Sequence, residues 1–169
     1  PARASLIDRL DWYTARLREA LPDTPLVNAV AEEAARADTV ITPPVTIHGD
    51  LHAGQLFLTA DGTAVSGLID VDTAGHGAAA DDSAAFIGHA LASMYASPPG
   101  PGAERMRALA RAAHGRWGTQ PGVRARLQVH LMGHALTAAP HDHDRASRLL
   151  TAAAAASHPA GLEEVADRT

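Results

Sequence analysis

The sequence predicts an α+β protein that is mostly α-helical and carries one small β-hairpin. Two observations favour helix: the composition is rich in Ala, a strong helix former, and apolar residues recur at helical spacing along several segments. A third observation predicts the hairpin, because Asp61-Gly62 joins two short strand-like runs. A length of 169 residues fits one domain, and we expect residues 1–169 to form it.

Two helices and an extended segment are predicted before residue 48. Apolar residues recur at helical spacing over residues 5–21, where Ser5 is a candidate N-cap. A second helix is expected over residues 26–37, with its charged residues on the side that faces water. Pro43-Pro44 ends any helix and introduces an extended segment at residues 45–47.

The hairpin occupies the middle of the chain. Its two strands are expected at residues 55–59 and 64–69, on either side of the Asp61-Gly62 turn. Residues 73–80 are rich in Gly and Ala, and this composition predicts a loop.

Four helices are predicted in the second half of the chain. Asp81 or Asp82 is expected to cap the first, which runs to about residue 97 and ends at a Pro- and Gly-rich segment. The other three are expected at residues 103–117, 123–138 and 142–157. Asp142 is the expected N-cap of the last helix, and residues 163–169 are expected to fray.

Composition excludes several classes of function. A formal net charge of −5 argues against a broad nucleic-acid surface. The absence of Cys excludes disulfides, thiol chemistry and zinc–thiolate sites. The sequence has no long apolar stretch and no signal-peptide pattern, so a cytoplasmic protein without a membrane partner is expected. Because the chain begins at Pro1, we expect it to be a piece of a longer or processed polypeptide.

One acidic loop carries the main functional signal. The run His48-Gly49-Asp50-Leu51-His52-Ala53-Gly54-Gln55 precedes the hairpin, and Gly67-Leu68-Ile69-Asp70 ends it. A hairpin folds the chain back on itself and can bring Asp50, Gln55 and Asp70 to one edge of a small sheet. Oxygen-bearing side chains that converge in this way suit Mg²⁺ and a phosphoryl group.

Each polar residue of the two loops has an expected role in such a site. Asp50 would orient an acceptor hydroxyl and accept its proton, while Asp70 would bind a metal ion. Gln55 offers a neutral carbonyl oxygen as a second metal ligand. His48 is expected to orient the loop by bonding to backbone or to a carboxylate, and Asp72 to add a ligand or shape the loop.

The pattern His-Gly-Asp-Leu-His-x-x-Gln followed by Ile-Asp-x-Asp resembles a family of small-molecule kinases. This family includes aminoglycoside phosphotransferases, choline kinases and maltokinases, and the resemblance covers residues 45–91 by motif. It implies that Asp50 is the catalytic aspartate and that Gln55 and Asp70 bind the metal and the nucleotide. Asp82 matches the structural aspartate that opens the following helix in the family.

The resemblance also implies a fold and a reaction. The fold would be the C-terminal lobe of a protein-kinase-like fold. The reaction would transfer the γ-phosphate of ATP or GTP, with Mg²⁺, to a hydroxyl of a small molecule such as an aminoglycoside, an amino alcohol or a sugar.

Three departures separate this chain from the family pattern. Gln55 replaces the usual Asn and resembles the maltokinase-like branch, and Gly75-His76-Gly77-Ala78 replaces a Gly-Asp-Pro loop. The segment before His48 is predicted to be helical and, like the rest of the chain, contains no Lys, so it does not resemble the N-terminal nucleotide lobe. That lobe is therefore an expected partner, in the same or a longer chain.

Two alternative functions remain open. A lone lobe can act as a binding or regulatory module, and an apolar face where the N-terminal lobe would dock can support a homo-oligomer. A metal-dependent hydrolase is a weaker alternative, built on His48 and His52 or on His130 and His134. The last pair lies one helical turn apart but lacks the Glu of a zincin helix, so we favour the kinase.

Overall fold

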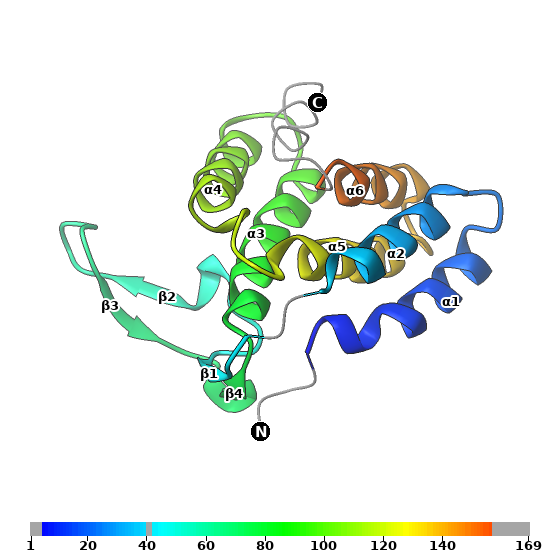
Figure 1. The fold of residues 1–169 in the computed structure, drawn as a ribbon. Helices are drawn as coiled ribbons and strands as arrows, with labels where there is room; N and C mark the ends of the chain where they lie inside the picture. Colours follow the sequence, from blue (N-terminus) through cyan, green and yellow to red (C-terminus); the bar gives the residue numbers. More distant parts are fainter. Residues whose placement is uncertain (1–4, 40–41, 157–169) are drawn as a thin grey trace.

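A computed structural model describes residues 5–39 and 42–156 of the chain (Figure 1). Its α-helices are α1 (Leu10–Ala20), α2 (Leu26–Ala37), α3 (Ala79–Ala96), α4 (Pro101–Trp117), α5 (Val123–Ala138) and α6 (His143–Ala155). Its strands are β1 (Val45–Ile47), β2 (Leu56–Leu58), β3 (Val65–Leu68) and β4 (Gly75–Gly77). Short 3₁₀ turns form at η1 (Ile7–Arg9), η2 (Ala53–Gln55) and η3 (Val71–Thr73). The described part is mostly helical, as predicted.

The helices pack around α3 and α5. Helix α3 contacts α4 and α5, while α5 also contacts α1, α2 and α6 (Figure 1). Because α5 is covered on several sides, it buries residues all round its circumference, including Leu127, Val129 and Leu131. The core is built from Leu, Val, Ile and many Ala side chains, which is what the Ala-rich, aromatic-poor sequence predicts.

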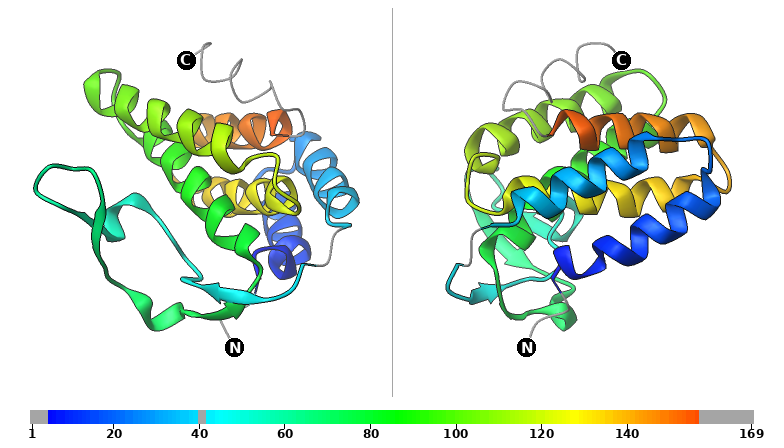
Figure 2. Two further views of the ribbon diagram at one scale, coloured as in Figure 1. Left: turned by 60° about the vertical axis from the view of Figure 1, so that its left-hand side comes forward. Right: turned by 45° about the vertical axis from the view of Figure 1, so that its right-hand side comes forward.

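The strands form two separate antiparallel pairs. Strands β2 and β3 make the predicted hairpin, with Leu56 opposite Leu68 and a bulge between Phe57 and Leu58. The hairpin extends away from the helices (Figure 2). Strand β1 pairs with β4, so that Val45 lies opposite Gly77.

The prediction of a loop over residues 73–80 is wrong at residues 75–77, which form strand β4. Its sequence, Gly75-His76-Gly77, has little intrinsic preference for strand. The strand forms because its backbone pairs with β1, which comes about thirty residues earlier and has no other partner among the described strands. Tertiary pairing therefore overrides local composition at this point.

Helix α2 has the predicted bounds, but two predicted N-caps are wrong. The first helix begins as η1 and continues as α1, and the Ser5 hydroxyl donates to Asp81 instead of capping. Helix α3 begins at Ala79, so Asp81 and Asp82 lie in its first turn and make long-range bonds.

At the start of α6 the prediction is confirmed. The Asp142 carboxylate accepts a hydrogen bond from the backbone N–H of Arg145 at 2.8 Å. The end of the predicted helix at residue 157 and the predicted frayed segment 163–169 lie outside the described residues.

A buried ion-pair network fixes the start of α3. Asp81 accepts hydrogen bonds from the Leu6 backbone N–H at 3.1 Å and from Nε of Arg126 at 3.1 Å. The same guanidinium bonds Asp38 through Nη1 at 2.9 Å. The network ties α3 to α5, to the N-terminal segment and to the end of α2. Asp82, the next residue, is thereby placed to reach the acidic loop.

Candidate active site

Asp82 holds the acidic loop through the loop backbone. Its Oδ2 accepts from the N–H of His48 at 2.7 Å, and its Oδ1 accepts from the N–H of Gly49 at 2.8 Å. Gly49 has a φ of 88°, and a Cβ at this position would lie 2.6 Å from the backbone oxygen of Thr73. Only glycine therefore fits where the chain turns from β1 into the loop.

His48 joins the two loops of the site. Its side chain is buried, and its Nε2 lies 2.9 Å from the backbone oxygen of Ile69. The backbone oxygen of His48 in turn accepts from the hydroxyl of Thr73 at 2.9 Å. His48 therefore fixes the position of the loop that carries Asp50 relative to the loop that carries Asp70.

Gln55 and Asp70 are brought together, with the amide nitrogen facing the carboxylate. Gln55 is buried, and its Nε2 donates to Oδ2 of Asp70 at 3.2 Å. Its Oε1 accepts from the backbone N–H of His52 at 2.8 Å. The oxygen thereby takes part in the 3₁₀ turn η2, and the expected role of Gln55 as a carbonyl ligand stays a prediction.

Asp70 has an unusual backbone conformation. It is exposed and lies in the left-handed region, with φ 62° and ψ 44°. This conformation is costly for a residue with a Cβ, although Asp tolerates it better than most residues. Strained residues of this kind concentrate at functional sites. Asp72, two residues further on, is exposed in the first turn of η3.

Asp50 faces a histidine that the sequence did not single out. Its Oδ1 lies 3.4 Å from Nε2 of His89 on α3, and 40% of its side chain is exposed. His89 follows Asp82 by seven residues, which is two helical turns, so both lie on the same face of α3. That spacing is the only signal in the sequence that could have identified His89.

Four histidines lie next to one another beside Asp50. The His89 ring contacts those of His52, His130 and His134, with centroid distances of 4.8, 4.6 and 5.0 Å. His130 and His134, one turn apart on α5, contact each other at 4.8 Å. The sequence identified this last pair and His52, but not His89.

Burial and neighbouring imidazoles lower the pKa of three of the four clustered histidines. Burial, aided by His134 and His89, lowers the pKa of His130 well below its usual value. Burial and His89 lower the pKa of His134 to about 4. Burial followed by His89 also lowers the pKa of His52, against the opposing effects of Asp50 and Asp70. The carboxylates of both loops therefore act on His52.

A small pocket adjoins His89 and His134 of this cluster. It has a volume of about 210 Å³ and lies between α3, α5 and α6. Its polar lining comes from His89, Ser93, His134, Thr137 and Arg145. None of the described residues that line it is Asp or Glu. Because His89 also contacts Asp50, this pocket borders the candidate catalytic loop.

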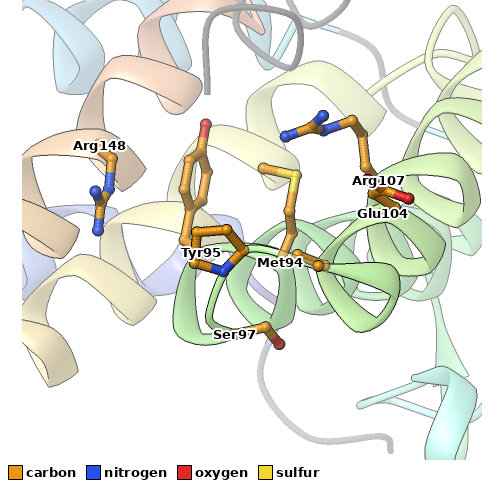
Figure 3. Close-up of a pocket in the computed structure, with 9 residues that line it drawn as sticks. Met94, Tyr95, Ser97, Glu104, Arg107 and Arg148 are labelled. Atoms are coloured by element: carbon orange, nitrogen blue, oxygen red, sulfur yellow. The ribbon is translucent and has the colours of Figure 1, made fainter.

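A second pocket, of about 270 Å³, lies at the other end of α3 (Figure 3). Met94 and Tyr95 line it on α3, and Arg107 and Arg148 approach from α4 and α6. Burial raises the pKa of the Tyr95 hydroxyl, although the two guanidinium groups oppose this effect. The distance along α3 from Asp82 to Met94 is about 18 Å at 1.5 Å per residue, so this pocket is separate from the acidic loop.

Comparison with protein families identifies the class. Residues 2–126, well over half of the chain, match the family described as the phosphotransferase enzyme family, and the chain belongs to it. The match includes both loops, Asp82 and His89, and it ends inside α5 before His130. No curated protein and no solved structure matches the chain significantly. Within residues 5–39 and 42–156, no helix is long and apolar enough to cross a membrane.

Proposed function

We propose that this protein transfers the γ-phosphate of ATP or GTP to a hydroxyl of a small molecule. Family membership supports phosphotransferase activity in general. The more specific proposal, transfer of the γ-phosphate to a hydroxyl, rests on the hydrogen bonds around the two loops. Asp82 fixes the backbone of the loop that bears Asp50, and His48 ties that loop to the segment that bears Asp70. Phosphoryl transfer depends on such fixed positions, because it is mostly positioning and charge stabilisation.

Asp50 is the proposed catalytic residue. Its side chain is 40% exposed, so its carboxylate can accept a hydrogen bond from a hydroxyl and then the proton. The contact of Oδ1 with Nε2 of His89 orients this carboxylate. The hydroxyl oxygen forms the new bond to phosphorus as the bond to the nucleoside diphosphate breaks.

Asp70 is the proposed ligand for Mg²⁺, which would neutralise the charge of the nucleotide phosphates. Its donor chemistry fits, because an exposed carboxylate oxygen is the ligand that Mg²⁺ prefers. The Gln55 amide bonds only Oδ2, which leaves Oδ1 for a cation. We assign Gln55 the role of positioning Asp70, because its own oxygen bonds the backbone of His52.

The acceptor is proposed to bind in the pocket between α3, α5 and α6. Among the described residues, its lining offers hydroxyls, two imidazoles and one guanidinium, from Arg145. Because none of these lining residues carries a carboxylate, a polycationic aminoglycoside would be poorly matched. A neutral or anionic polyhydroxy compound such as a sugar fits this lining better.

An acceptor screen tests the proposal. ADP formation would be followed with MgATP and a panel of sugars, amino alcohols and aminoglycosides. We expect turnover with a sugar-type acceptor, and a loss of at least about 100-fold in Asp50→Asn. Glu32→Gln, which neutralises an exposed carboxylate on α2, is the matched control and should retain activity. Equal activity of Asp50→Asn and the wild-type protein would contradict the assigned role.

A binding or regulatory module is the second candidate. The observation that favours it is the apolar outer surface of the hairpin, where Phe57, Leu58 and Val65 are each more than half exposed. An exposed patch of this kind is typical of a docking face, here for an N-terminal lobe or a second copy. Sedimentation velocity of the wild-type protein and of Phe57→Ser tests self-association. A dimer that Phe57→Ser abolishes, combined with no nucleotide binding, would favour this candidate.

A further inference from the structure

Three of the clustered histidines come from two helices and lie within reach of a single ion. One candidate ligand nitrogen each from His89, His130 and His134 lies within 4.8 Å of the other two. We propose that these three residues form a binding site for a transition-metal cation of the zinc class. The site is separate from the magnesium site, and it does not depend on the proposed phosphotransferase function.

The donor set selects the kind of metal. Imidazole nitrogens suit Zn²⁺, Cu²⁺ and Ni²⁺, whereas Mg²⁺ takes oxygen ligands. A tetrahedral zinc ion with bonds of about 2.0–2.1 Å places its nitrogen ligands about 3.4 Å apart. The three nitrogens must therefore approach by at most about 1.4 Å, which side-chain rotation can supply. His130 and His134 stand at i and i+4 on α5, on the same face of the helix.

An unpartnered buried atom points to a missing ligand. His130 is 8% exposed, and its Nδ1 has no hydrogen-bond partner among the described residues. Buried polar atoms normally find a partner, because an unmade bond in an apolar interior is costly. A polar ring with an unsatisfied nitrogen, packed among two other imidazoles, is the arrangement that a bound cation would satisfy.

Gly88 allows the cluster to form. A Cβ at Gly88 would lie 2.3 Å from Nδ1 of His130, so any larger residue would push the ring away. The next residue is His89. The missing side chain therefore lets α3 and α5 approach at the point where the three imidazoles meet.

Asp50 provides the outer support that a metal-bound histidine usually has. Metal-ligating histidines generally donate their second ring N–H to a carboxylate, which fixes the tautomer and the ring. Nε2 of His89 lies 3.4 Å from Oδ1 of Asp50, so a proton on Nε2 leaves the Nδ1 lone pair for a metal.

A bound ion would be accessible and would have a structural effect. His89 and His134 also line the 210 Å³ pocket, so water or a small-molecule oxygen can reach the site. The ion would link α3 to α5 and hold His89 against Asp50. We infer that the site positions Asp50 through His89.

Metal titration of the 169-residue protein tests the site. Zn²⁺ would be titrated at pH 7 in competition with a chromophoric chelator, and Co²⁺ would report geometry through its visible absorption. We expect one equivalent of Zn²⁺ and the intense band of tetrahedral Co²⁺. His89→Ala and His134→Ala should each weaken binding by at least about 100-fold, and Asp50→Asn by about 10–100-fold.

The exposed His143 and the proposed magnesium ligand Asp70 provide the controls. His143→Ala and Asp70→Ala should leave zinc affinity unchanged, and millimolar Mg²⁺ should not compete. His134 is partly exposed, so its variant is expected to fold, and circular dichroism checks this. Absence of stoichiometric binding would overturn the proposal. Wild-type affinity in both His89→Ala and His134→Ala would overturn it as well.

Discussion

The carboxylate of Asp82 lies 2.7 Å from the backbone nitrogen of His48, thirty-four residues earlier in the chain. Together with its bond to Gly49, this contact attaches the acidic loop to the first turn of α3. The buried pair of Asp81 and Arg126 fixes that same turn. The loop is therefore placed by the helical core, and most of the predictions below concern this connection.

Replacing Asp82 should loosen the acidic loop. In Asp82→Ala two partly buried N–H groups lose their acceptors, and each unsatisfied donor costs about 1–3 kcal/mol. We expect a lower free energy of unfolding in urea and weaker MgATP binding. Glu32→Ala, which removes an exposed carboxylate from α2, should change neither quantity. Unchanged stability of Asp82→Ala would show that the loop is held by other contacts.

Gly49→Ala should be more harmful than Gly62→Ala, although both glycines have positive φ. Residues with a Cβ pay about 1–2 kcal/mol in this conformation at either position. At Gly62 nothing lies within 4 Å of the added Cβ, whereas at Gly49 it meets the backbone oxygen of Thr73 at 2.6 Å. The difference between the two melting temperatures isolates the steric contact, and equal temperatures would contradict this view of the turn.

Arg126→Met should be strongly destabilising. It leaves the buried carboxylate of Asp81 without its ion-pair partner, a change that costs about 3–5 kcal/mol in comparable buried pairs. Arg124→Met removes an exposed arginine from the same helix, and surface pairs contribute about 1 kcal/mol or less. Urea unfolding of both variants measures the contrast. A small effect at Arg126 would mean that the network contributes little to stability.

The fold was predictable where the signal is local. The bounds of α2 follow from periodicity and flanking prolines, and Asp142 caps α6 as expected. Strand β4 was not predictable, because its glycines form a strand only through pairing with β1.

The sequence was sufficient to propose the residues of the candidate site, but not the contacts between them. The motif identified Asp50, Gln55 and Asp70, yet it could not show that the Gln55 oxygen bonds the backbone of His52. His89 was missed because its position depends on how α3 packs against α5 and the loop. No local pattern encodes that packing.

Stability should fall as the pH falls from about 6.5 towards 4. The folded-state pKa of His134 is lowered to about 4, so the unfolded chain binds this proton first. The neutral His134 imidazole therefore makes its full contribution to the free energy of unfolding above pH 6.5. This contribution is lost as the pH falls towards 4. Urea unfolding with a chelator present should show a slope between pH 4.5 and 6.5 that is smaller in His134→Gln. His143→Gln should keep the wild-type slope, and an equal slope in all three proteins would be inconsistent with this pKa.

The most direct test of the proposed phosphotransferase is a calorimetric titration of the 169-residue protein with MgATP, alongside Asp70→Ala and Glu32→Ala. We predict binding by the wild-type protein and by the control Glu32→Ala, with at least about a tenfold loss of affinity in Asp70→Ala. Without Mg²⁺, the wild-type protein should lose affinity to a similar extent. Binding that is independent of both Mg²⁺ and Asp70 would contradict the assigned metal site, and no binding by any of the three proteins would contradict nucleotide-dependent phosphoryl transfer by this chain.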